Sequence, residues 1–136
     1  MIEHAIRLKR NEDLKKAIEN YCLFEHINTA VILSGVGCLS KLHIRLAKAV
    51  SKLEIEDDFE IVSLNGTISN GQAHIHIAAS DARAKTYGGH LLEGCLVNTT
   101  VELVLGELEN FRPRREYDEG TGYDEIIFKE GKDVYR

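Results

Sequence analysis

Cysteine is scarce in this chain, and nothing in its placement suggests a cross-link or a thiolate metal site. Cys22, Cys38 and Cys95 are odd in number, far apart and never part of a Cys-x-x-Cys pair, so a disulfide scaffold is disfavoured. We therefore expect a reducing, cytoplasmic environment. No apolar run approaches the length of a membrane span, and the first residues lack the apolar core of a secretion signal.

Positive charge is also in short supply. The chain has 17 Lys and Arg against 22 Asp and Glu, a net charge of −5, which disfavours a general attraction to nucleic-acid phosphates. It also lacks a Walker loop, a Gly-x-Ser-x-Gly elbow and a dinucleotide fingerprint. No repeat, low-complexity tract or linker divides the sequence, so we expect a single domain over residues 1–136.

Hydrophobic periodicity predicts one principal helix, over residues 11–24, with Asn11 as its N-cap, acidic residues in its first turn and His26 as a charge partner near its C-terminal end. The alternation of apolar and polar residues predicts strands. We expect these strands at residues 2–8, 29–33, 39–50, 59–68, 72–80 and 97–105.

Several segments are expected to interrupt this pattern. Ser34–Gly37 should bend the chain after the second strand, and Asp57–Asp58 should interrupt a short segment before the fourth strand. Phe111–Gly120, which holds the only proline and many charges, is expected to be an exposed loop. Tyr123–Lys129 is expected to be an edge strand docking back on the body. Six to eight mostly antiparallel strands with one helix define an α+β sheet fold, and its uncovered face suggests burial against further copies of the chain.

Three histidines carry the strongest functional signal. His74 and His76 alternate with apolar residues, so both side chains share one strand face, with their backbone positions about 6.6 Å apart. A turn over residues 81–85 can return the chain antiparallel and bring His90, which follows two glycines, to the same place. Three neutral imidazoles in one place are a candidate site for a divalent metal, with zinc the first choice. Histidines that merely face solvent or core partners fit the same alternation, and that alternative stays open.

Two carboxylates could assist such a metal. Three histidine ligands leave a tetrahedral zinc ion one open position, the pattern of catalytic sites. Glu93 and Glu102 are the acidic residues within reach in sequence that could orient a ligand or accept a proton. Glu93 could equally cap a turn, and Glu102 could simply face outward from a strand.

The order of several short motifs spans nearly the whole chain. They are Arg7-Leu8, Glu12-Asp13-Leu14, Ser34-Gly35-Val36-Gly37, Phe59–Gly66, His74-Ile75-His76, Gly88-Gly89-His90-Leu91, Glu93-Gly94, Thr99–Leu105 and Thr121-Gly122. In this order they resemble the PPC domain family (plants and prokaryotes conserved domain), whose members stand alone in bacteria and archaea and are fused to AT-hooks in plants. The resemblance implies an α+β fold with a central antiparallel sheet and one principal helix. It also implies a homotrimer, and a metal on the three histidines in some prokaryotic members.

The resemblance has limits as well as implications. In plant members the stretch that matches Asp58–Val62 is linked to protein contacts, so it implies a nearby subunit or partner surface. The chain has no AT-hook, because Pro113 lacks the preceding glycine. Ala84 stands where a glycine is common, which leaves the shape of the hairpin and the reach of His90 open.

Three functions follow as predictions. The first is a trimeric metal-binding protein whose biochemical role is unassigned. The second is a DNA-binding or transcription-regulating protein, and the third is a metal-dependent hydrolase or lyase acting on a small molecule through the same histidines. We expect no membrane partner for any of them.

Overall fold

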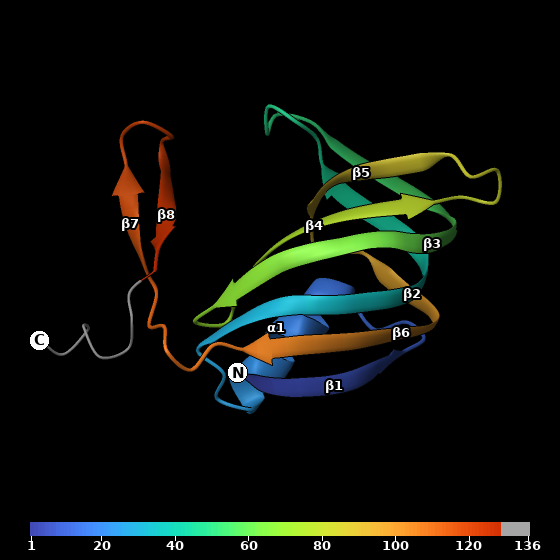
Figure 1. The fold of residues 1–136 in the computed structure, drawn as a ribbon. Coiled ribbons are helices and arrows are strands. Elements are labelled where there is room, and N and C mark those ends of the chain that lie inside the picture. The colour runs from blue at the N-terminus through green and yellow to red at the C-terminus, as the bar shows by residue number, and fades with distance from the viewer. Residues whose placement is uncertain (129–136) are drawn as a thin grey trace, which may run out of the picture.

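A computed structural model describes residues 1–128 of the chain. Within them lie one helix and eight strands: β1 (Ile2–Lys9), α1 (Leu14–Phe24), β2 (Thr29–Arg45), β3 (Lys52–Ser69), β4 (Gln72–Ser80), β5 (Thr86–Leu91), β6 (Leu96–Glu107), β7 (Arg114–Asp118) and β8 (Tyr123–Ile127). No helix within residues 1–128 is long and apolar enough to cross a membrane. The expected antiparallel sheet with one helix is confirmed (Figure 1).

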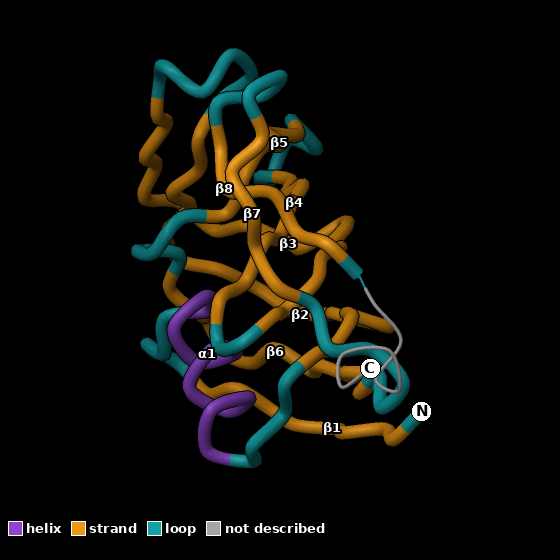
Figure 2. Tube along the Cα trace, turned by 90° about the vertical axis from the view of Figure 1, so that its left-hand side faces the viewer, coloured by secondary structure: helices purple, strands orange, loops and turns teal. Residues whose placement is uncertain are grey.

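Six strands form one sheet in the order β1-β6-β2-β3-β4-β5. The C-terminal end of β2 also pairs with β5, where Arg45 lies opposite His90. Strands β2 to β5 therefore close on themselves at this end of the sheet. Strands β7 and β8 pair with each other as a separate hairpin, which stands at one end of the sheet in front of β3 and β4 (Figure 2).

Helix α1 packs on the core through one stripe of side chains. Leu14, Ile18 and Cys22 follow at four-residue spacing and are fully buried, as one face of an amphipathic helix requires. The Asp13 carboxylate caps the helix, accepting the backbone N–H of Lys16 at 3.1 Å and that of Gly94 at 2.7 Å. One side chain therefore fixes both the start of the helix and the turn before β6.

The other face of the sheet carries exposed apolar side chains. In Figure 1 the helix lies behind β1, β6 and β2, and no helix of residues 1–128 covers the side toward the viewer. Leu33 and Val36 on β2 are 48% and 57% exposed, and Val62 on β3 is 63% exposed. Leu33 follows the buried Ile32 and Val62 follows the buried Ile61, so alternation turns both away from the core. We call Leu33, Val36 and Val62 the open-face cluster.

The helix boundary differs from the sequence expectation. Asn11 is not the N-cap; it has a φ of 71° in the preceding turn, and the helix starts after Asp13. The first turn holds no acidic residue and the last holds no basic one. His26 lies beyond the helix end with a φ of 56°, so it ends the helix through its backbone.

Both long strands run through segments that were expected to interrupt them. Ser34–Gly37 stays within β2, where the register shifts between Ile32 and Ser34 and again after Gly37. Asp57 and Asp58 form an irregularity inside β3. Pairing with neighbouring strands outweighs weak local preference at both places, and β-bulges absorb the extra residues.

The C-terminal region was also predicted incorrectly. Residues 111–120 were expected to be a loop but contain β7, and β8 pairs with β7 instead of docking on an edge of the main sheet. Lys129, the last residue of that expected edge strand, lies outside the described residues.

Candidate metal centre

The pairing of β4 with β5 brings the three histidines together. His74 and His76 alternate on β4 with the buried Ile75 and Ile77, so both imidazoles point away from the core. His76 lies directly opposite His90 in the β4–β5 ladder. The strand alternation that the sequence displays thus places two rings, and the antiparallel return supplies the third.

Two tight turns fix the register of these strands. Asn70 and Gly71 have φ values of 51° and 78° between β3 and β4, as expected for a two-residue hairpin turn with positive φ at both positions. Between β4 and β5 the Asp81 carboxylate accepts the backbone N–H groups of Arg83 and Lys85, both at 2.9 Å. Ala84 takes a φ of 64° in this turn, so it adopts the left-handed conformation that a glycine would favour.

The histidine nitrogens are close enough to share an ion. One nitrogen from each of His74, His76 and His90 lies within 4.8 Å of the others, and the ring centroids are 5.2 to 5.8 Å apart. Nitrogens bound tetrahedrally to zinc are about 3.4 Å apart, from a bond length of about 2.05 Å. Small side-chain rotations would therefore complete the set.

One nitrogen of His90 lacks the hydrogen-bond partner that buried polar atoms normally have. His90 Nδ1 is buried and forms no hydrogen bond within the described residues. A buried polar atom left unpaired costs about 1–3 kcal/mol. A metal ion bound at Nδ1 would supply the missing partner, so this observation fits a ligand role.

Burial favours the neutral, metal-binding form of two of the three rings, His74 and His90. Burial lowers the pKa of His90 to about 4, with Arg45 as the next largest cause. Burial, followed by the neighbouring His76 and Arg115, also lowers the pKa of His74. His90 is therefore neutral at pH 7, with a nitrogen lone pair available and no proton to release.

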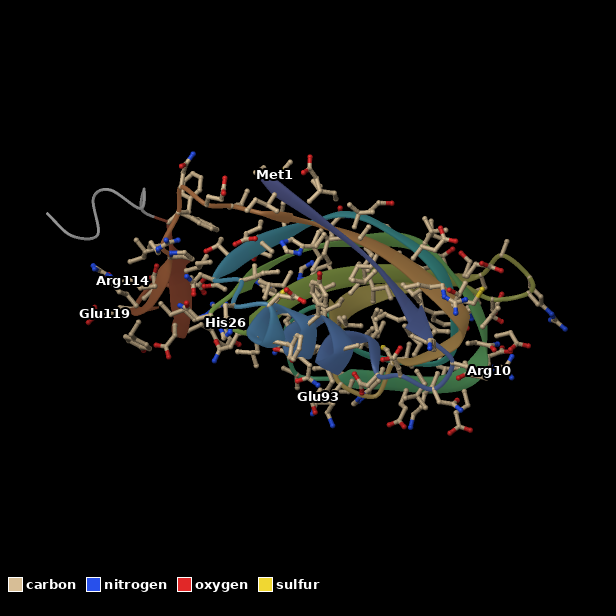
Figure 3. The ribbon with its side chains drawn as sticks, turned by 90° about the horizontal axis from the view of Figure 1, so that it is seen from below. Met1, Arg10, His26, Glu93, Arg114 and Glu119 are labelled. Atoms are coloured by element: carbon tan, nitrogen blue, oxygen red, sulfur yellow. The ribbon has the colours of Figure 1, made fainter. Side chains whose placement is uncertain are left out.

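A cavity of about 640 Å³ opens beside His74 and His90. Glu93 lines it, and its carboxylate lies 3.6 Å from Lys16 Nζ while its carbonyl accepts a hydrogen bond from His43 Nδ1 at 2.6 Å. Figure 3 shows Glu93 beside the helix. Glu93 thus lines the same cavity as His74 and His90, but its carboxylate forms an ion pair with Lys16 of helix α1.

Glu102 is not brought to the histidines. It is exposed on β6, opposite Arg7 on β1 and Val36 on β2. It is absent from the lining of the cavity. Glu102 is an exposed strand residue, as the alternative given in the sequence analysis states.

Sequence reasoning missed two arginines at this site. Arg45 lies at the end of β2 opposite His90, and Arg115 comes from β7; both line the cavity. The alternation of β2 shows that Arg45 leaves the core, but no short-range pattern reveals the β2–β5 pairing. Arg115 fell in a segment that was expected to be a loop, so nothing pointed to it.

A mostly antiparallel sheet with one helix and a three-histidine cluster at a hairpin defines the structural class of this protein. The chain belongs to the Plants and Prokaryotes Conserved (PCC) domain family, whose model matches residues 1–109. The resemblance inferred from the motifs is thereby confirmed. The hairpin of β7 and β8 lies beyond the matched residues.

Known relatives extend this comparison. A bifunctional protein GlmU from Synechococcus sp. (strain JA-3-3Ab) is 36% identical over 123 residues, and the chain spans about a fifth of that protein's length, since the match covers 90% of the chain but only 20% of the relative. A hypothetical protein from Salmonella cholerae-suis has a TM-score of 0.92 at 31% identity, over 96% of this chain and 94% of its own.

Two further solved structures differ in their descriptions. A metal-containing protein from Archaeoglobus fulgidus has a TM-score of 0.79 at 28% identity, over 93% of this chain and 94% of its own. A protein from Bacteroides thetaiotaomicron, described only by a supposed DNA-binding role, has a TM-score of 0.82 at 24% identity, over 93% and 91% of the two chains. The second likeness shows the fold alone.

Proposed function

We propose that the protein binds one divalent metal ion per chain, zinc first, through His74, His76 and His90. The observation that carries this proposal is the convergence of three imidazole nitrogens within 4.8 Å, with His90 Nδ1 buried and unpaired among the described residues. The metal-containing relative from Archaeoglobus fulgidus supports it by analogy. Zinc suits three imidazoles because its tetrahedral sites take nitrogen ligands readily.

A metal held this way would have one open position facing the cavity. When bound, the metal ion would polarise a ligand there and lower the pKa of a water molecule. The chain's own contribution is to lower the pKa of His74 and His90, to orient the three rings by strand pairing, and to place two arginines beside them. The biochemical role of the site stays unassigned.

Elemental analysis tests the metal proposal. Protein purified without a histidine tag should contain about one zinc or other divalent ion per chain. His76→Ala and His90→Ala should lose this metal, while His26→Asn, which changes a histidine outside the cluster, should keep it. Native protein that folds normally, contains no metal and takes none up from added zinc would contradict the proposal.

We also propose that three copies of the chain assemble through the open-face cluster. Its apolar side chains, Leu33, Val36 and Val62, are about half exposed or more in the isolated chain, and closed cyclic assembly is a common way to bury such a surface. The number three comes from the family resemblance. Light scattering on purified protein should give three times the mass of one chain.

A pair of matched substitutions tests the interface. Val62→Asp would place a charge inside the proposed interface and should give monomers. Val50→Asp makes the same change at a residue that is 85% exposed in the turn after β2, so it should leave the trimer intact. Monomeric wild-type protein at micromolar concentration would contradict the assembly.

The two other functions stay predictions. A net charge of −5 disfavours DNA binding, and a gel-retardation assay at low salt with no shifted duplex would remove that prediction. A hydrolase or lyase would use the same three histidines. It would be distinguished from a protein that only binds the metal by catalytic turnover of a substrate. Loss of that turnover on metal removal would support it.

A further inference from the structure

The cavity beside the histidines is built by segments far apart in the sequence. Lys15 and Glu19 come from α1, Arg45 from the end of β2, and Arg115 from the C-terminal hairpin. The hairpin stands at one end of the molecule, opposite Arg10, and carries Arg114 and Glu119 (Figure 3). A wall of the cavity therefore comes from residues beyond those that the family model matches.

Two lysines of helix α1 near the cavity each have an acidic partner. Lys15 Nζ lies 2.9 Å from Glu19, and Lys16 Nζ lies 3.6 Å from Glu93. Arg45 and Arg115 differ, because neither forms an ion pair within residues 1–128. Arg115 donates to the backbone carbonyl of Asp124 at 3.2 Å, a neutral acceptor. Both arginines are half-buried residues, and neither has an ion-pair partner among the described residues.

The two arginines lie close to the candidate metal ligands. Arg45 is directly opposite His90 in the β2–β5 pairing. Arg45 and Arg115 line the same cavity as His74 and His90. A group bound at the open metal position would therefore lie near both guanidiniums.

Acidic side chains in the cavity set the balance of charge. Asp124 and Glu125 line it from β8, and Glu125 accepts a hydrogen bond from Thr121 Oγ1 at 3.1 Å. Among the described residues, three basic and four acidic side chains line the cavity, so a bound divalent metal makes the balance of these charges positive. Negative charge is then favoured at the metal and the arginines, while the β8 carboxylates suit a polar or basic remainder of the ligand.

We propose that the cavity binds a small molecule through a carboxylate or phosphate group placed between the metal's open position and Arg45 and Arg115. The inference rests on the proposed metal site and names the class of ligand it takes. The planar guanidinium fork matches both oxyanions in a bidentate way. A neutral ligand would leave both arginines without a counter-ion.

A cobalt-substituted protein makes the binding visible. The full chain, loaded with Co²⁺ and checked for metal content, is titrated separately with acetate, inorganic phosphate and a neutral amide, acetamide. The visible spectrum reports ligands at the metal. We expect acetate or phosphate to change it with saturation and acetamide to have no effect, and the comparison of the two anions distinguishes carboxylate from phosphate ligands.

Three substitutions at the arginines separate the sources of affinity. Arg45→Met and Arg115→Met keep the apolar stem and should each weaken anion binding about tenfold or more, as loss of a charged hydrogen bond predicts. Arg45→Lys keeps the charge without the fork and should fall between. Arg114→Met is the matched control, because Arg114 bonds Glu116 on the hairpin and does not line the cavity.

The outcomes distinguish this inference from the metal proposal. Anion binding that depends on Arg45 and Arg115, with metal content unchanged in every variant, supports it. Cobalt binding with no spectral response to either anion, or with equal responses in all variants, overturns this inference and leaves the metal site standing. Failure to bind cobalt or zinc at all overturns both.

Discussion

Replacing Gly66 with alanine is expected to destabilise the protein and to weaken its metal site together. Gly66 on β3 lies opposite Ile75, between the two histidines of β4. A Cβ at this position would lie 2.8 Å from Ile75 Cα and 2.7 Å from Ile75 Cγ1, and closer still to the carbonyl oxygen of His74. Carbon atoms prefer separations of about 3.5–4.0 Å, so β4 must move by about 1 Å.

The magnitude follows from two opposing effects. Overpacking a close backbone contact costs about 1–3 kcal/mol, here toward the upper end because a carbonyl and a Cα cannot rotate away. Alanine in place of glycine in a strand returns about 0.5–1 kcal/mol of backbone entropy. We therefore expect Gly66→Ala to lower the free energy of unfolding by about 2 kcal/mol, and displacement of His74 to weaken zinc binding about tenfold or more.

Gly88→Ala provides the matched control. Gly88 on β5 also faces β4, opposite Ala78, but the nearest atom to its added Cβ is the Ile77 carbonyl oxygen at 3.2 Å. Its unfolding free energy should change by about 0.5 kcal/mol or less. Urea denaturation and zinc competition titrations measure both quantities. A Gly66→Ala protein as stable as wild type, or a Gly88→Ala protein equally damaged, would refute the reasoning.

Three further changes have expected outcomes. Ala84→Gly should raise the melting temperature, with a gain of about 0.5–1 kcal/mol, because alanine adopts a φ of 64° there; a lower melting temperature would show that the turn is not strained. Asp13→Ala should cost about 2 kcal/mol in urea denaturation through loss of two backbone hydrogen bonds, and Asp13→Asn should cost less because it keeps a capping oxygen. Cys22 and Cys95, whose pKa values burial raises to about 11, should resist iodoacetamide at pH 8 in the native protein, because thiolate is the reactive form. Rapid labelling of either thiol without unfolding would contradict their burial.

Local pattern was enough to predict the parts of the fold that depend on neighbours in sequence. The alternation around His74 and His76 predicted a strand with two rings on one face, and the expected strands at 59–68 and 72–80 flank the observed turn at Asn70 and Gly71. The family resemblance, carried by motifs spread along the chain, supplied the sheet with one helix. These signals are local in origin, and the structure retains them.

Long-range pairing decided what local pattern could not. Asp57–Asp58 has weak strand preference, yet it continues β3 because β2 holds its flanks. Arg45 reaches the candidate site only through the β2–β5 pairing. Arg115 reaches it only because the C-terminal hairpin contributes to the same cavity. Contacts between residues distant in sequence produce no periodic pattern along the chain. The sequence alone therefore could not assign Arg45 and Arg115 to the cavity.

Crystals of the protein grown without added metal, with diffraction recorded on both sides of the zinc absorption edge, test the central claim most directly. We expect one anomalous peak per chain, bonded to nitrogens of His74, His76 and His90 at about 2.0–2.1 Å. Absence of a peak after soaking in zinc, with each imidazole instead hydrogen-bonded to a separate protein group, would contradict it.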